Sequence, residues 1–346
     1  MQVVEVTDRE EWDAEVNALG GHPMQLWGWG EVKATGPWAA RRLRVTDDDG
    51  GVLGLAQVLV RKLPIPFKSL CHVPRGPVIA PVGDPRADGW GAGPGVGETE
   101  TRQQVTEAIV AWCRRSVGGV GITLEPDWAA GTSLKLAGER PSPNPILYPH
   151  TLILDVSQPE DKLLAAMRKS TRYEIRKAAR SGLDIRRVTN EADVKAVLEL
   201  YHQSAEQAGF GLHHDGYYLA INRELGEASH LFAAYDENGK PCSFVWAIAS
   251  TTTAFLLYGG VNDAGRRLQA TAPVYWASIS DAGRLGVLRY DLNGLLNEGI
   301  SKFKRSFANH EDELIGSIDV PFSALDVVWN RGLPVAKRVL RKLNSR

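Results

Sequence analysis

Hydrophobic and polar positions along the chain predict two halves with the same order of elements. In the first half, two helical segments are followed by a hairpin of alternating strands, another strand, a long helix and a last strand. The predicted helices are 7–19, 23–34 and 99–117, and the predicted strands are 38–46, 51–62, 70–73 and 121–125. The glycine- and proline-rich stretch 83–97 is predicted to be a surface loop, and 129–149 to be irregular.

The second half repeats this order. Its predicted helices are 158–181, 190–209 and 269–285, and its predicted strands are 229–235, 242–249, 254–258 and 288–291. We therefore predict an α/β (α+β) protein of two related domains with mixed, mostly antiparallel sheets. Two unrelated α+β halves remain the alternative, because the repeat lies in the order of elements and not in the residues themselves.

Composition and charge add limits to this picture. The chain has 346 residues, 43% hydrophobic and 23% charged, which suits two domains with sizeable cores. Its net charge of -1 argues against nucleic-acid binding over the whole surface, so an RNA contact needs a local basic patch. Residues 324–346 form a basic amphipathic pattern. We favour a terminal helix packed on the first domain over a membrane or RNA tether.

Cysteines and apolar runs give no sign of secretion or membrane insertion. Cys71, Cys113 and Cys242 are widely spaced and predict neither a disulfide framework nor a zinc site. The first residues lack the apolar core of a signal peptide, and the apolar runs are too short to span a bilayer. We expect a soluble, cytoplasmic protein without a bound metal.

Common catalytic motifs are missing, but the order of elements is similar to that of the GNAT acyltransferases. GxSxG, HExxH and GxxxxGK[ST] do not occur, and GxGxxG follows no strand. GNAT enzymes cradle the coenzyme A pyrophosphate on a loop of the form [RQ]xxGx[GA], where glycine admits the phosphates. The nearest match is 267–272, with alanine at position 270 in place of that glycine. The sequence therefore indicates an acyl donor other than coenzyme A, and no cofactor.

A basic stripe marks the segment 161–187. Its cations recur at helical spacing beside an apolar face, and like charges so arranged repel one another. In a chain of net charge -1, a bound polyanion accounts for such a stripe; arginines paired with acids on neighbouring elements are the alternative. The cations are Arg168, Lys169, Arg172, Arg176, Lys177 and Arg180.

Five motifs occur in order along nearly the whole chain. The longest is 167–182, within the basic segment. The others are Trp27-Gly-Trp-Gly-Glu-Val-Lys33, Val73-Pro-Arg-Gly-Pro77, Tyr290-Asp-Leu-Asn-Gly294 and Phe303-Lys304-Arg-Ser-Phe307. Together they resemble the Fem family of aminoacyl-tRNA-dependent transferases that build peptidoglycan interpeptide bridges. No stretch has the length or heptads of the coiled-coil arm found in several members, so the chain resembles the short form.

The resemblance implies two tandem GNAT-like domains facing a shared cleft. It implies a first domain of residues 1–150 completed by 316–346, and a second domain of residues 151–315. It further implies transfer of glycine, alanine or serine from aminoacyl-tRNA to an amine of a UDP- or lipid-linked muropeptide, with the basic stripe as the tRNA contact. We expect a monomer that touches the inner membrane face peripherally.

Matching positions give the acceptor residues that the resemblance implies. Lys33 matches a lysine that contacts the substrate phosphate, and Tyr217 and Tyr258 match tyrosines of the same cleft. His213 stands where the family usually has a phosphate-directed arginine. Since a neutral imidazole offers one donor in place of a charged fork, the carrier of the acceptor is left open. Arg75 is placed in this set too, although it is equally suited to tying its turn.

The resemblance places Lys304, with Phe303 beside it, near the aminoacyl transfer. Aminolysis of an activated ester needs positioning and oxyanion stabilisation more than a dedicated base. We expect Lys304 to stabilise the developing negative charge or the leaving tRNA oxygen; a plain surface lysine is the alternative. Asp291 is predicted to be structural, orienting the turn through Asn293 and Gly294.

Three other functions compete with this prediction. His213 favours a related transferase that acts on a small-molecule or natural-product peptide acceptor. An ordinary acyl-CoA N-acyltransferase is disfavoured by the missing glycine motif. A non-catalytic GNAT-like module that binds RNA or the cell-wall machinery is disfavoured by the presence of Lys33 and Lys304.

Overall fold

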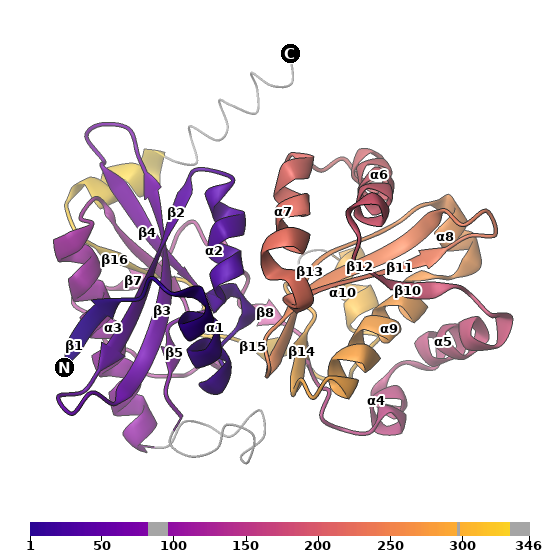
Figure 1. The fold of residues 1–346 in the computed structure, drawn as a ribbon, viewed down its shortest axis with the longest axis horizontal. Coiled ribbons are helices and arrows are strands. Elements are labelled where there is room, and N and C mark those ends of the chain that lie inside the picture. Colours follow the sequence, from indigo (N-terminus) through magenta and orange to yellow (C-terminus); the bar gives the residue numbers. More distant parts are fainter. Residues whose placement is uncertain (82–95, 296–297, 333–346) are drawn as a thin grey trace.

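The computed structural model describes residues 1–81, 96–295 and 298–332. Two mixed β-sheets lie side by side, each with helices packed on it (Figure 1). We call the part of the chain around the first sheet the first domain, and the part around the second sheet the second domain. The division at residues 150 and 316 stays a prediction.

The first domain has an eight-stranded sheet in the order β1-β2-β3-β4-β6-β16-β7, with β5 paired to β3. Its strands are β1 Gln2–Glu5, β2 Trp38–Thr46, β3 Val52–Lys62, β4 Ser69–Pro74, β5 Val78–Ile79, β6 Gly121–Glu125, β7 Arg140–Pro141 and β16 Ile318–Pro321. Its helices are α1 Arg9–Ala18, the 3-10 turn Pro23–Gln25, α2 Trp27–Ala34 and α3 Val96–Ser116. In Figure 1, α1 and α2 lie on the side of this sheet that faces the second domain.

The second domain has a six-stranded sheet in the order β10-β11-β12-β13-β14-β9. Its strands are β9 Ile153–Asp155, β10 Ile185–Val188, β11 Ser229–Tyr235, β12 Pro241–Ala249, β13 Thr253–Val261 and β14 Arg289–Asp291. Its helices are α4 Glu160–Ala166, α5 Lys169–Ser181, α6 Glu191–Ala208, α7 Asp215–Leu225, α8 Asp263–Leu268, α9 Thr271–Arg284 and α10 Glu298–Lys304. A short antiparallel pair forms where the chain passes from the first domain to the second and back. Its strands are β8 His150–Thr151 and β15 Asp312–Glu313.

The two sheets have the same plan. In each, the only parallel pair described is joined through a helix, β4 with β6 through α3 and β13 with β14 through α9. An antiparallel strand from elsewhere in the chain then flanks the pair, β16 beside β6 and β9 beside β14. The predicted order of helices, hairpin, strand, helix and strand is confirmed for the first half. In the second half, α4, α5, α6 and α7 precede the hairpin instead of two helices, and α6 and α7 hold the places of α1 and α2.

One of the hydrophobic cores crosses between the domains. It joins Trp12 and Trp29 of the first domain to Tyr218, Trp246 and other apolar residues of the second. The other two cores lie under α9 in the second domain and under α3 in the first. Since apolar burial is what stabilises most packed interfaces, the shared core fixes the two sheets against each other.

The predicted helix 158–181 is wrong in its continuity. The chain leaves the helix at Met167, where ψ is 157°, and α5 starts after the extended Arg168. The Arg168 backbone N–H donates to the Ser306 carbonyl at 2.9 Å, so a tertiary contact takes the hydrogen bond that a continuous helix needs. Helices α7 and α8 and strands β1 and β10 were missed.

Other expectations fall at the edges of the described chain. Residues 83–95 of the predicted surface loop 83–97 lie outside the described residues, and 96–97 already belong to α3. Most of the predicted terminal helix also lies outside them, although 325–332 are helical. Among the residues that the structure describes, no helix has the length and apolar character needed to cross a membrane.

Candidate functional site

Helices α2 and α7, which hold the same place in their two domains, cross at the domain junction. A Cβ on Gly28 of α2 would lie 2.2 Å from the Glu224 carbonyl of α7, so glycine is required for this close approach. The crossing brings Lys33 to Tyr217, and the Lys33 Nζ donates to the Tyr217 Oη at 3.0 Å. The same ammonium lies 4.7 Å from the centre of the Trp29 ring. The tryptophan- and glycine-rich element therefore positions Lys33.

An aromatic cluster surrounds this contact. The His213 ring stacks on Tyr217 with centroids 4.2 Å apart, and Tyr258 packs against Tyr218 at 5.3 Å. Partial burial and the nearby Lys33 lower the pKa of His213, so this imidazole is neutral at pH 7. Burial and the neighbouring Tyr217 raise the pKa of Tyr258, so its hydroxyl keeps its proton. The structure thus brings together Lys33, His213, Tyr217 and Tyr258. Tyr201 and Tyr218 complete the cluster, and no motif pointed to them.

The parallel strands of the second domain separate beside this cluster. β13 pairs with β14 only from Thr253 to Phe255, while β13 continues to Val261. A register shift in the β12–β13 ladder leaves Leu257 as an extra residue just before Tyr258. The Asn293 side chain, beyond the end of β14, donates to the Leu256 carbonyl at 3.0 Å and holds the turn against β13.

Lys304, the last residue of α10, binds the turn that follows β14. Its side chain is 6% exposed, and its Nζ donates to the carbonyls of Asn293 at 3.0 Å and Gly294 at 2.9 Å. An ammonium group has three donors, so these two bonds leave one N–H for another acceptor. Burial lowers the pKa of Lys304 to about 8, against the opposing effect of Asp291. The alternative of a plain surface lysine is wrong, because the side chain is buried.

Phe303 is turned the other way. Its ring packs edge-on against Tyr275 of α9 at 5.0 Å and against Phe307 at 5.3 Å. It is partly buried, and these contacts anchor α10 to the second domain.

Arg75 lies in a buried polar junction between the domains. It is 3% exposed, donates to the Tyr148 carbonyl at 3.1 Å and has its guanidinium 5.6 Å from the Phe255 ring centre. Across the same junction, the guanidinium of Arg289 pairs with Asp127. Arg75 is therefore placed within the protein rather than on its surface.

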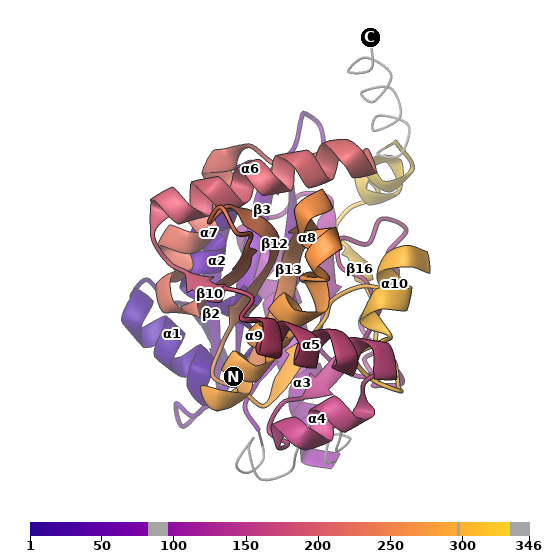
Figure 2. The same cartoon turned by 90° about the vertical axis from the view of Figure 1, so that its right-hand side faces the viewer.

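The basic stripe lies largely on α5, which faces the viewer in Figure 2. It divides into exposed cations and Arg172, which is used locally. The Arg172 guanidinium donates to the Ala165 carbonyl at 3.0 Å and also to Met167, and so caps the end of α4. Lys177 donates to the Gln269 side chain at 2.8 Å, just before α9. The exposed members of the stripe are Arg168, Lys169, Arg176, Lys177 and Arg180.

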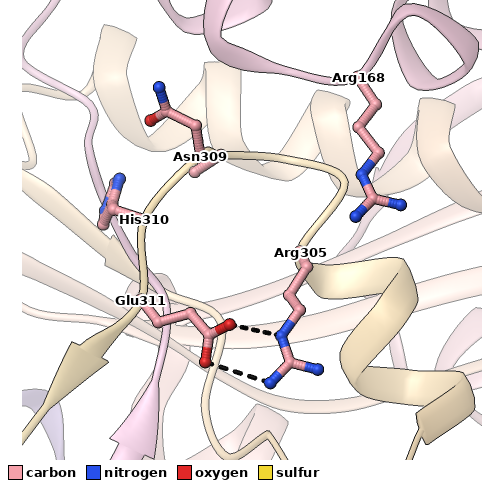
Figure 3. Close-up of a pocket in the computed structure, with 6 residues that line it drawn as sticks. Arg168, Arg305, Asn309, His310 and Glu311 are labelled. Atoms are coloured by element: carbon pink, nitrogen blue, oxygen red, sulfur yellow. Dashed lines mark hydrogen bonds and ion pairs between the residues drawn. The ribbon is translucent and has the colours of Figure 1, made fainter.

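A pocket of about 420 Å³ joins the start of this stripe to the segment after Lys304. It is lined by Arg168, Arg305, Ala308, Asn309, His310 and Glu311. Figure 3 shows the Arg168 side chain pointing from the chain before α5 toward the 305–311 loop, and Arg305 paired with Glu311. That pair is bidentate, at 2.5 and 3.1 Å, so Arg305 is held in place.

The segment that a coenzyme A pyrophosphate would need is used for packing. A Cβ on Gly265 of α8 would lie 2.1 Å from the Cys242 carbonyl, so this glycine serves the contact between α8 and β12. Ala270, at the position of the cradle glycine, is fully buried. Within the described ranges, no group of three or more histidine, cysteine or acidic residues is arranged to hold a metal ion.

Comparisons with known proteins agree with the fold. Residues 165–305 match the model of the acetyltransferase (GNAT) domain. The chain is 26% identical over 248 residues to the Lipid II:glycine glycyltransferase of Staphylococcus aureus, a match that covers 69% of this chain and 53% of that protein. The chain thus spans about half the length of the curated relatives it matches.

Solved structures extend the likeness to the whole fold. The crystal structure of FemX superposes with a TM-score of 0.78 at 19% identity, covering 95% of this chain and 99% of that one. A tandem GNAT protein from the clavulanic acid pathway superposes with a TM-score of 0.51 at 12% identity, covering 93% and 98%. The tandem GNAT-like fold and the resemblance to the Fem family are both confirmed.

Proposed function

We propose that this protein transfers an aminoacyl group from aminoacyl-tRNA to an amine of a peptidoglycan precursor. The observation that carries the proposal is the buried Lys304 ammonium, which binds the turn after β14 and has a third N–H with no partner among the described residues. It does so in a chain similar to a glycyltransferase over most of its length.

The acceptor side is supplied by the junction of α2 and α7. Lys33, held by Tyr217 and Trp29, presents a positive charge of the kind that binds the phosphate of a UDP- or lipid-linked carrier. The tyrosines around it offer hydroxyl groups and ring faces to a sugar and a stem peptide. Because the two residues of the Lys33–Tyr217 contact come from different domains, this site depends on both.

The donor side is supplied by α5 and the pocket at its start. The exposed cations of α5 suit an RNA backbone, whose affinity comes largely from phosphate contacts. The hydrogen bond from Arg168 to Ser306 places the start of the stripe two residues from Lys304. The stripe thus offers a path along which the aminoacylated end of the tRNA reaches Lys304.

The reaction follows from this placement. The acceptor amine attacks the ester carbonyl, a C–N bond forms, and the bond from that carbon to the ribose oxygen breaks. The proton that the amine loses ends on the ribose oxygen. The free N–H of Lys304 stabilises the negative charge that develops on the carbonyl or the leaving oxygen in a water-poor site.

A transfer assay tests the proposal. Purified protein is mixed with tRNA charged with radiolabelled glycine, alanine or serine and with UDP-linked or lipid-linked muropeptide. We expect RNase-sensitive transfer of label to one muropeptide, which also identifies the amino acid. Acyl transfer from acetyl-CoA, with no transfer from any charged tRNA, would contradict the proposal.

His213 favours one second candidate, a transferase for a peptide acceptor without a phosphate carrier. A neutral imidazole stacked on Tyr217 supplies no charged fork to a pyrophosphate. Competition between the UDP-linked muropeptide and the free stem peptide separates the two candidates. Equal use of both acceptors would favour the carrier-free reaction.

A further inference from the structure

Buried polar atoms without partners gather at the junction of the two domains. In the described part of the chain, His22 Nε2, Arg75 Nε, Asp127 Oδ1 and Asp291 Oδ2 are buried and lack a hydrogen-bond partner. Electrostatic interactions link Arg75 to both His22 and Asp291, and Asp127 to Asp291. Buried polar groups are nearly always satisfied, so a group of such atoms in one place points to a role other than stability.

Asp291 occupies the end of this junction that is nearest Lys304. It is 1% exposed at the last position of β14. One carboxylate oxygen accepts from the Thr151 hydroxyl and from the Asn293 backbone N–H, the latter at 2.6 Å. The other oxygen is the unpartnered one.

The satisfied oxygen fixes the turn that holds the lysine. Asn293 has φ of 59°, a left-handed conformation that the Asp291 bond supports, since aspartate commonly stabilises such turns. The carbonyls of Asn293 and Gly294 in this turn are the two acceptors of the Lys304 ammonium. Gly294 is required in the turn, because a Cβ there would lie 2.7 Å from the Tyr148 ring.

We propose that Asp291, with Arg75 of the first domain behind it, is the positioning residue of Lys304. One oxygen of the carboxylate sets the turn that aims the ammonium, and its negative charge favours the ammonium form of the buried lysine. Arg75 in turn keeps the carboxylate charged. The inference rests on the proposed function only for what Lys304 does, and not for how Lys304 is held.

The charges around the pair give the sign of the effect. Lys304 faces Asp291, while Asp291 also faces Arg75 and Asp127, and Arg75 and Arg289 both act on His22. Burial raises the pKa of Asp291, whereas Arg75, Thr151 and Asn293 oppose that rise. Burial lowers the pKa of Lys304, and the charge of Asp291 opposes that change. Removing the charge of Asp291 therefore lowers the pKa of Lys304, so the lysine loses its proton at a lower pH.

The test measures Lys304 directly, by NMR titration of lysines carbon-labelled at Cε, with Lys304→Arg used to assign the signal. In Asp291→Asn the remaining oxygen still accepts from Asn293, so the turn is kept while the charge is lost. We expect the titration midpoint of Lys304 to move to lower pH. Glu125→Gln, at the matching strand end of the first domain, is the control and leaves the midpoint in place.

Activity supplies the second readout. In Asp291→Asn we expect kcat to fall by about three-fold or more at pH 8 and to stay near the wild-type value at pH 6, with KM for both substrates unchanged. Arg75→Gln acts through the same carboxylate, so the double variant with Asp291→Asn loses no more than the worse single variant.

The outcomes separate the inference from the proposed function. A shifted Lys304 titration in Asp291→Asn supports the inference even if the wild-type protein shows no transfer, a result that would remove the proposed function alone. An unchanged titration in Asp291→Asn overturns the inference, whether or not the melting temperature falls. Asp291→Asn is close in shape to the wild type, and thermal unfolding checks that it is folded.

Discussion

The ends of β6 and β14 are matching places in the two domains, and they are built for different purposes. Each strand runs parallel to its neighbour and ends on a buried carboxylate, Glu125 in β6 and Asp291 in β14. Glu125 is fully satisfied, by His72 at 2.8 Å, Ser317 at 2.6 Å and two backbone N–H groups. Asp291 keeps one oxygen unpartnered, within the described chain, beside Lys304.

The strands themselves show the same contrast. β4 pairs with β6 along the whole of β6, whereas β13 runs six residues, 256–261, past its last partner in β14. In the first domain, paired strands thus occupy the position that corresponds to the Lys304 site of the second domain. The two domains therefore share the arrangement of their strands. They differ in the partners of the carboxylate at the strand end, which stabilises the first domain and serves the reaction in the second.

Lys304→Met gives the largest effect expected from this contrast. We expect kcat to fall by about 10² to 10³-fold, as when one oxyanion donor is removed. The free energy of unfolding falls by about 1 to 3 kcal/mol, because the carbonyls of Asn293 and Gly294 lose their buried donor. Single-turnover transfer and thermal unfolding check the two halves of this prediction. Lys302→Met, on an exposed neighbour in α10, is the matched control. Wild-type activity in Lys304→Met would show that Lys304 takes no part in the reaction.

Glu125→Ala gives the complementary result in the first domain. The change leaves His72 and several buried donors without an acceptor, so we expect the free energy of unfolding to fall by about 3 kcal/mol. The kcat per folded molecule stays unchanged. Denaturant unfolding at neutral pH measures the loss of stability, and activity divided by the concentration of folded protein measures the kcat. A loss of kcat without a loss of stability would break the comparison between the two carboxylates.

The pH dependence of that stability has a definite sign. Burial opposes the charge of Glu125, but the His72 contact, Ser317 and the Leu147 N–H outweigh it and lower the pKa of Glu125 from 4.5 to about 2. A lowered carboxyl pKa contributes stability above pH 4.5 that is lost as the pH falls toward 2. The difference in unfolding free energy between wild type and Glu125→Ala therefore shrinks over this range.

Much of the fold was predictable because alternation and turn residues are local signals. The strands Trp38–Thr46 and Ser229–Tyr235 begin and end where the pattern predicts. The break at Met167 and Arg168 was not predictable, since it depends on a hydrogen bond to the distant Ser306. The use of Arg172 as a cap on α4 follows from that break and was hidden for the same reason.

The site was predictable in its members and not in its geometry. The motifs gave Lys33, Tyr217 and Tyr258, and the structure places them together. They did not indicate that Lys304 is held by two backbone carbonyls, because backbone acceptors leave no mark in the residue pattern. Asp291 was predicted to orient its turn, which the structure confirms, but the unpartnered oxygen needs coordinates to be seen.

Lys33→Met tests the contribution of the first domain to the acceptor site. We expect KM for a phosphate-carrying acceptor to rise about ten-fold with kcat nearly unchanged, because a charge-assisted contact is lost. Tyr217→Phe removes only the hydroxyl and serves as the milder comparison. Steady-state kinetics with varied acceptor and saturating tRNA measure both. An unchanged KM in Lys33→Met would indicate an acceptor without a phosphate and would favour the carrier-free candidate.

The smallest effects belong to single cations of α5, which lies before β10 in the second domain. We expect Arg176→Ala and Arg180→Ala each to weaken tRNA binding by about three-fold and to reduce the slope of log affinity against log salt by about 1. Fluorescence titrations with labelled tRNA between low and moderate salt measure this. Arg115→Ala, on the exposed side of α3, removes the same charge from the first domain and leaves the slope unchanged. An equal loss in all three variants would indicate a diffuse attraction to the whole surface. A loss confined to the α5 variants supports a basic track on α5 that leads toward Lys304.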